Sequence, residues 1–172
     1  MNEYEKQAAD FLAETGTTLT VEYLYTGPFF DEDKEGRDVY QFTLQNKRGV
    51  YSARYGDSLR NTAINAICRD RRECTVALAR TAGLISPYQR GVTIGDLHAA
   101  AQKARPVKPT AYDILACLSG YEPGTFRQWC DEYGYDTDSM KAHKIYMAVQ
   151  EEWEGMCRLF TAEEREKLAE IN

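Results

Sequence analysis

The sequence predicts an α+β fold: an N-terminal helix, a three-stranded antiparallel sheet, a helical insertion and a C-terminal helical layer. Three observations predict it. The first segment is amphipathic, three segments before residue 58 alternate with a period of two, and the C-terminal third has helical periodicity. Because consecutive strands with short connections usually pair with each other, we expect an antiparallel meander covered by the C-terminal helices.

The first helix is expected over residues 2–14, with Asn2 as its cap and Gly16 as its end. Its apolar stripe comprises Tyr4, Ala8, Phe11 and Leu12. Strands are expected at residues 17–25, 39–44 and 50–55, each with apolar and polar side chains in alternation. The connection "QNKRG" contains Gly49 and indicates a tight hairpin between the last two strands.

The C-terminal third is expected to form four helices. The first opens at a capping box from Thr110 to Asp113 and runs to Gly120. The second has Pro123 in its first turn and ends before Gly134, with one face made by Phe126, Trp129, Cys130 and Tyr133. A long amphipathic helix over about residues 139–160 and a short terminal helix that closes on Leu168 and Ile171 complete the layer.

Residues 59–108 have a weaker hydrophobic pattern, with short helices expected near 59–68, 73–82 and 94–104. We interpret this segment as an insertion between the sheet and the helical layer. The expected organisation is one compact domain, with 1–58 as helix plus sheet, 59–108 as the insertion and 109–172 as the helices packed on the sheet.

The charge is unevenly distributed along the chain. The formal net charge is -6, yet residues 59–108 contain nine Lys or Arg and three Asp or Glu, a net charge of +6. The remainder holds twelve basic and twenty-four acidic residues, a net charge of -12. Such asymmetry influences which partners approach rather than how a chain folds.

Two interpretations of these charges remain open. Arg and Lys runs are most often solvated helix faces, but a basic surface here is suited to contact phosphate or an acidic partner. The basic candidates are Arg60, Arg69, Arg71, Arg72 and Arg80. The acidic candidates are either ordinary solvated loop residues or a surface that competes with nucleic acid for a basic protein. They are Asp31, Glu32, Asp33, Glu35, Asp131, Glu132, Asp136 and Asp138.

The sequence lacks the motifs of known catalytic and cofactor sites. Cys68 and Cys74 enclose "RDRRE", but structural zinc sites need close pairs of ligands and no second pair lies nearby. Cys117, Cys130 and Cys157 are expected to be small buried hydrophobes. No phosphate-binding, dinucleotide-binding or zinc-protease motif is present, so we expect no metal, no cofactor and no catalysis.

No apolar run approaches the ~18 residues needed to cross a bilayer, and the N-terminus "MNEYEKQAADF" does not resemble a secretory leader. Five cysteines at irregular spacing do not suggest a disulfide framework. The expected location is the bacterial cytoplasm, without a membrane partner.

Two segments carry a resemblance to a known group of proteins. They are "MNEYEKQAADFLAETGTTLTVEYL" and "KPTAYDILACLSGYEPGTFRQWCDEYGYDTDSMKAHKIYMAVQEEW". The chain resembles small acidic proteins carried by prophages and other mobile elements of gut bacteria. The resemblance covers about residues 1–58 and 107–170, and the basic middle segment departs from it.

Most proteins of this group have no assigned function, but at least one similar protein is an anti-CRISPR that inhibits the type II effector Cas9. The resemblance implies a non-catalytic inhibitor that binds Cas9 with its guide RNA and blocks DNA binding or cleavage. An alternative is an accessory protein of a phage or integrative element that binds DNA or RNA through residues 59–108. Cas9 holds nucleic acid in positively charged channels. An acidic protein surface is therefore suited to occupy such a channel in place of DNA phosphates.

Overall fold

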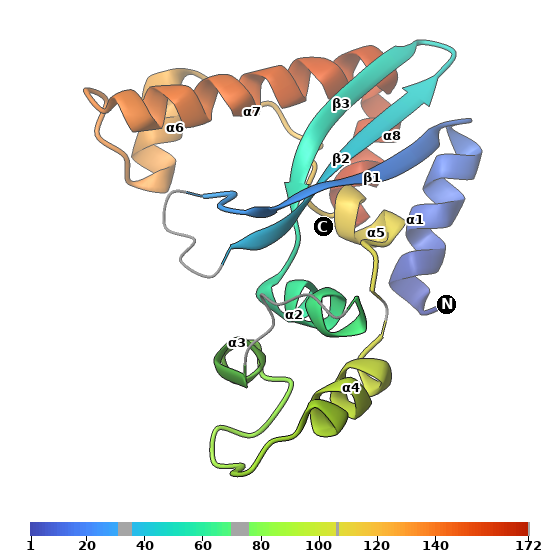
Figure 1. The fold of residues 1–172 in the computed structure, drawn as a ribbon. Coiled ribbons are helices and arrows are strands. Elements are labelled where there is room, and N and C mark those ends of the chain that lie inside the picture. The colour runs from blue at the N-terminus through green and yellow to red at the C-terminus, as the bar shows by residue number, and fades with distance from the viewer. Residues whose placement is uncertain (31–35, 70–75, 106, 172) are drawn as a thin grey trace. The chain divides into compact units, whose positions relative to one another are not determined.

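The computed structural model confirms the predicted α+β fold, and it describes residues 1–30, 36–69, 76–105 and 107–171. An N-terminal helix is followed by a three-stranded antiparallel sheet and then mostly by helices (Figure 1). The strands are β1 (Thr18–Gly27), β2 (Arg37–Asn46) and β3 (Gly49–Gly56).

The chain divides into two compact units. Unit 1 comprises Met1–Thr20, Thr43–Ser52 and Thr110–Asn172, and unit 2 comprises Val21–Phe42 and Ala53–Pro109. Every strand of the sheet therefore contributes residues to both units, and neither unit is one continuous piece of chain.

The sheet has the order β1-β2-β3, as expected for a meander. Lys47 and Arg48 form the turn between β2 and β3. In β2 the side chains of Tyr40, Phe42 and Leu44 are buried, whereas Gln41 and Gln45 between them are exposed. This alternation places one apolar face toward the core and leaves polar side chains on the other.

Unit 1 contains α1 (Glu3–Glu14), α5 (Ala111–Leu115), α6 (Phe126–Tyr133), α7 (Met140–Leu159) and α8 (Ala162–Ile171). Helix α1 begins at the predicted cap, where Asn2 Oδ1 accepts a hydrogen bond from the Glu5 backbone N–H at 2.8 Å. It packs against α5 and α8, and the ring of Phe11 lies 5.1 Å from that of Phe160. The predicted terminal residues Leu168 and Ile171 are both buried.

Unit 2 contains α2 (Leu59–Cys68), α3 (Val76–Thr81) and α4 (Ile94–Lys103), close to the three helices expected in the insertion. These helices have their own apolar cluster, formed by Ile64, Ile67, Ala79, Ile85, Leu97 and Ala101. The Thr93 to Asp96 capping box opens α4 as predicted. The weak hydrophobic pattern of this segment therefore reflects the small size of its core.

Three details of the C-terminal prediction were wrong. Helix α5 ends at Leu115 rather than near Gly120, because Gly120 is buried directly against the backbone of α8 and the chain turns to reach it. Pro123 lies outside α6, which is capped by Thr125. Cys130 is buried as expected, but Cys117 and Cys157 are exposed, since each lies on the solvent side of its segment.

Candidate binding surfaces

An acidic tip, defined by Asp131, Glu132, Asp136 and Asp138, lies at one end of the α6–α7 hairpin. Asp131 and Glu132 belong to the last turn of α6, and Asp136 and Asp138 belong to the connection that follows. Gly134, with φ of 72°, ends α6 in the left-handed conformation that glycine adopts without strain. All four side chains are exposed and lie within eight residues of chain.

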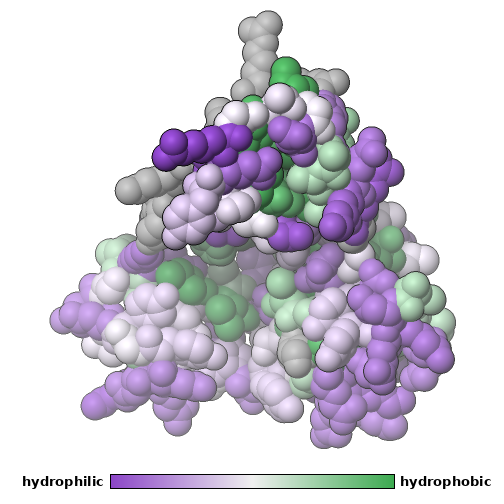
Figure 2. Space-filling model, turned by 90° about the horizontal axis from the view of Figure 1, so that it is seen from below, coloured by the Kyte–Doolittle hydropathy of each residue, from purple (hydrophilic) through white to green (hydrophobic). Residues whose placement is uncertain are grey.

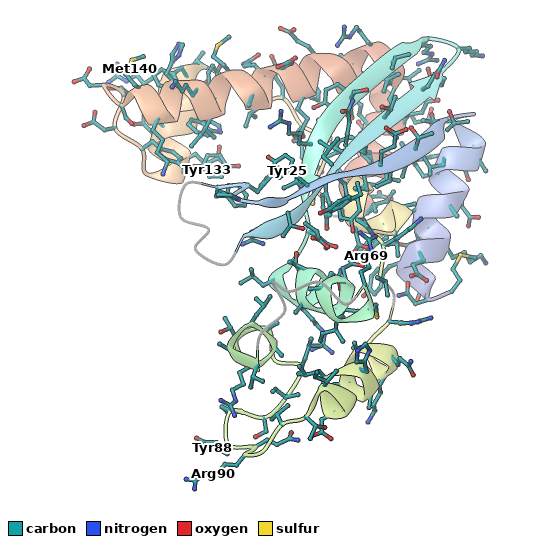
Figure 3. The ribbon with its side chains drawn as sticks, in the orientation of Figure 1. Tyr25, Arg69, Tyr88, Arg90, Tyr133 and Met140 are labelled. Carbon is teal, nitrogen blue, oxygen red and sulfur yellow. The ribbon has the colours of Figure 1, made fainter. Side chains whose placement is uncertain are left out.

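Aromatic side chains lie close in sequence to the acids of the tip. Trp129 is buried, and its ring stacks on Tyr135 with centroids 5.0 Å apart and an angle of 5° between the planes. Tyr133 and Met140 are 62% and 72% exposed and are the last residue of α6 and the first residue of α7. Figure 3 shows Met140 at the outer end of α7 and Tyr133 at the lower end of α6, apart from it. Exposed aromatic and methionine side chains are enriched at protein contact surfaces.

The small core of the hairpin holds this tip in place. Trp129, Cys130 and Ala142 are its buried members, and Phe126, Ile145, Tyr146 and Val149 pack around them. Tyr146 donates a hydrogen bond from its hydroxyl to the Gly124 carbonyl at 2.6 Å, which fastens the start of α6 to α7. The tip is therefore presented by a fixed hairpin. The other acidic candidates, Asp31, Glu32, Asp33 and Glu35, lie outside the described residues.

The basic candidates that the structure describes are Arg60, Arg69 and Arg80, and all three side chains are exposed on unit 2. The guanidinium of Arg69 lies 5.1 Å from the ring centroid of Tyr23, a cation–π contact. Arg80 donates to the Gln89 carbonyl at 2.7 Å, and Arg60 lies 3.5 Å from the Gly83 carbonyl. Two of these arginines therefore steady the α3–α4 connection. Arg71 and Arg72 lie outside the described residues.

A groove of about 460 Å³ runs along α4 in unit 2, and we call it the α4 groove. Its walls include Arg60 from α2, Leu84 and Gln89 from the α3–α4 connection, and Asp96, Ala100 and Lys103 from α4. Sequence reasoning did not single out Lys103 or Gln89 as site residues. The available signal was the run of alanines between Asp96 and Lys103, because small side chains on one helix face leave space beside it.

A buried polar network in unit 2 was also missed. Asp38 and Asp57 are both fully buried, and Thr26 donates from Oγ1 to Asp38 Oδ1 at 2.6 Å. Asp57 Oδ1 accepts from the Ser58 backbone N–H at 2.7 Å and from Asn61 Nδ2 at 3.0 Å. A carboxylate at the start of α2 is favoured by the helix dipole, so this network joins α2 to the strands.

Tyr40 belongs to the same network, and its hydroxyl accepts a hydrogen bond from Asn65 Nδ2 at 3.0 Å. Burial, followed by the charges of Asp38 and Asp57, raises the pKa of Tyr40 to about 12, while Arg69 and the Asn65 hydrogen bond oppose the shift. The neutral hydroxyl is thus favoured. These contacts are those of a structural network within unit 2, in which Asn65 Oδ1 is left without a hydrogen-bond partner among the described residues.

The two units differ in charge. Unit 1 contains nine Lys or Arg and seventeen Asp or Glu, a net charge of -8, whereas unit 2 contains twelve and ten, a net charge of +2. Hydrophilic residues dominate the face drawn in Figure 2, where hydrophobic residues form small separate patches. Net charge therefore distinguishes the two units from each other.

Within the described ranges, no three His, Cys, Asp or Glu side chains gather as metal ligands would, and no helix is long and apolar enough to span a bilayer. Comparisons with the models of known protein families, with curated proteins and with solved structures found no match to this chain.

Proposed function

We propose that the protein acts by binding rather than by catalysis, as an anti-CRISPR-type inhibitor of a Cas9 effector complex. The observation that carries the proposal is the acidic tip, where four exposed carboxylates lie close in sequence to the exposed side chains of Tyr133 and Met140, on a hairpin with its own core. The resemblance to mobile-element proteins supplies the effector as the expected partner.

The negative charge of the acidic tip is attracted to the positively charged surfaces that bind nucleic acid. Channels that hold DNA or RNA are lined by Lys and Arg, and an acidic protein surface competes with phosphates for them. The exposed ring of Tyr133 and the side chain of Met140 add apolar area that can be buried against the channel wall. The proposed contact therefore combines charge steering with a small apolar centre.

The test compares two variants of equal net charge. The tip variant replaces Asp131 and Asp136 by Asn, together with Glu132→Gln and Asp138→Asn. The control variant neutralises four other exposed acids of unit 1, through Glu151→Gln, Glu154→Gln, Glu163→Gln and Glu166→Gln. Both changes raise the net charge by four, so any difference between them reports position rather than total charge.

Binding to the purified Cas9–guide RNA complex and cleavage of target DNA are measured for each protein. The wild-type chain is expected to bind and to reduce cleavage, the tip variant to bind at least about tenfold more weakly, and the control to remain within about twofold. A wild-type chain that neither binds the complex nor lowers cleavage would refute the proposal for that effector. Equal losses in both variants would assign the effect to total charge.

A second candidate is a nucleic-acid-binding accessory protein that uses unit 2. It is favoured by one observation: among the described residues, Arg60, Arg69, Arg80, Arg90, Lys103, Arg105 and Lys108 are exposed and none forms an ion pair. Phosphate contacts by these side chains predict affinity for naked DNA that falls steeply as salt increases. An inhibitor that uses only the acidic tip would not bind naked DNA.

A further inference from the structure

The α4 groove joins two features that rarely coincide on a solvated helix, namely an apolar wall and charged rims of opposite sign. Its apolar wall is made by Leu84, Ile85 and Ala100, which also belong to or pack on the core of unit 2. Because that wall is part of the core, the shape of the groove is fixed by packing rather than by the surface side chains.

Charges of opposite sign lie toward opposite ends of α4. Asp96 and Lys103 both line the groove and are seven residues apart, which corresponds to about 10 Å along the helix axis. Asp96 is fixed by the capping box, in which its Oδ2 accepts the Thr93 backbone N–H at 2.9 Å. Lys103 and Arg60 form no ion pair among the described residues, so both cations can serve a ligand.

This polarity matches the chemistry of a nucleotide. A nucleotide has an anionic phosphate at one end and, at the other, a flat base whose edge carries hydrogen-bond donors and acceptors. Lys103 and Arg60 suit the phosphate, the alanine side of α4 suits the face of the base, and the Gln89 amide and Asp96 suit its edge. The volume of about 460 Å³ lies within the range of ligand sites of this size.

The loop beside the groove adds an aromatic platform. Tyr88 is 89% exposed and Arg90 is exposed, and they flank Gln89 in sequence. Figure 3 shows both at the tip of the α3–α4 connection. Arg80 holds this loop through its 2.7 Å hydrogen bond to the Gln89 carbonyl. An exposed ring next to cations is the arrangement on which successive bases of a single strand stack.

We propose that the α4 groove binds one nucleotide of a single-stranded nucleic acid, with its phosphate on Lys103 and Arg60 and the neighbouring base stacked on Tyr88. This site uses unit 2 alone and does not depend on the proposed inhibition of an effector. The proposal specifies the second candidate function in two respects. The nucleic acid is single-stranded, and the α4 groove and Tyr88 contact it.

The experiment measures fluorescence anisotropy of a labelled oligothymidine of about ten nucleotides, titrated with the full chain between about 50 and 200 mM salt. A duplex of the same length and unlabelled AMP are the competitors. The variants are Lys103→Gln and Tyr88→Ala, and the matched controls are Lys144→Gln and Tyr121→Ala, which are exposed residues of unit 1 outside the acidic tip.

We expect the single strand to bind more tightly than the duplex. Lys103→Gln should weaken binding about fivefold or more and reduce the salt slope by about 0.7, the value of one lost phosphate contact to a single strand. Tyr88→Ala should weaken binding by about 5- to 100-fold, and the controls should stay within about twofold.

Several results would overturn the proposal. Binding unchanged within twofold in both groove variants would place the contact elsewhere. Duplex that binds as tightly as the single strand would show a general phosphate surface. AMP that competes as strongly as the oligonucleotide, with Tyr88→Ala without effect, would show a free-nucleotide site. Failure to bind any of the three ligands would remove the site while leaving the test of the acidic tip unaffected.

Discussion

Gly120→Ala is predicted to destabilise unit 1 strongly, because no space exists for even one methyl group. A Cβ on Gly120 would meet the carbonyl oxygen of Arg165 and lie 2.8 Å from the Cβ of Ala169, both in α8. Carbon atoms in contact normally lie about 3.5–4.0 Å apart. The segment carrying residue 120 must therefore move away from α8 by about 0.7 Å or more.

The cost follows from that displacement. Overpacking of a filled core costs about 1–3 kcal/mol. The neighbouring Ser119 backbone N–H donates to Glu152 Oε1 at 2.7 Å, and strain in a hydrogen bond to a charged group adds a fraction of its ~1.5–3 kcal/mol. We expect a loss of about 2–4 kcal/mol, or a Tm lower by roughly 4–16 °C for a chain of this size.

Thermal unfolding followed by circular dichroism is the assay, and Gly49→Ala is the control in the same unit. A Cβ on Gly49 would lie 4.0 Å from the nearest atom, Leu159 Cδ2, which is an ordinary contact. That variant should change stability by less than about 0.5 kcal/mol. If Gly120→Ala melts within about 2 °C of the wild-type protein, the close approach of residue 120 to α8 is wrong.

Two further predictions concern buried polar groups. Tyr40→Phe removes the hydroxyl that accepts from Asn65 Nδ2, and Asn65 Oδ1 is already without a hydrogen-bond partner among the described residues. Tyr40→Phe should lower the free energy of unfolding, measured by chemical denaturation, by about 1–3 kcal/mol. Adding Asn65→Leu should recover part of this loss, and the exposed control Tyr4→Phe should change the free energy little. An unaltered denaturation midpoint for Tyr40→Phe would contradict the buried contact. Burial raises the pKa of Glu152, opposed by the hydrogen bond from Ser119. A raised folded-state pKa means that the charged carboxylate weakens the fold at neutral pH and that this penalty disappears as pH falls below the ordinary range of a glutamate. Glu152→Gln should therefore raise the Tm at pH 7 and match the wild-type Tm in acid; a lower Tm at pH 7 would show that the hydrogen bond outweighs burial.

The fold was predictable where local signals agree with packing. The Asn2 cap, the Thr93 to Asp96 box and the alternation of Tyr40, Phe42 and Leu44 are each short-range patterns, and each appears in the structure as expected. The helical stripe that ends at Phe160 is of the same kind, because one long face repeats over several turns.

The missed features depend on contacts between distant residues. Gly120 ends its segment by touching α8, about forty-five residues later, and nothing in the local sequence encodes that approach. The α4 groove similarly needs Arg60 of α2 beside Lys103 of α4. For the candidate site, the sequence indicated which charges to consider. The structure places Asp131 and Glu132 in the last turn of α6, and Asp136 and Asp138 in the connection that follows.

The partners of α1 are made late in synthesis. Phe11 packs on Phe160, and α1 also contacts α5 and α8, all of which lie beyond residue 110. At elongation rates of about 5–20 residues per second, roughly 7–30 seconds pass before Phe160 and α8 are synthesised and can cover the apolar stripe of this helix. A ribosome stalled before α8 should therefore hold a chain whose first helix is still accessible to chaperones and proteases.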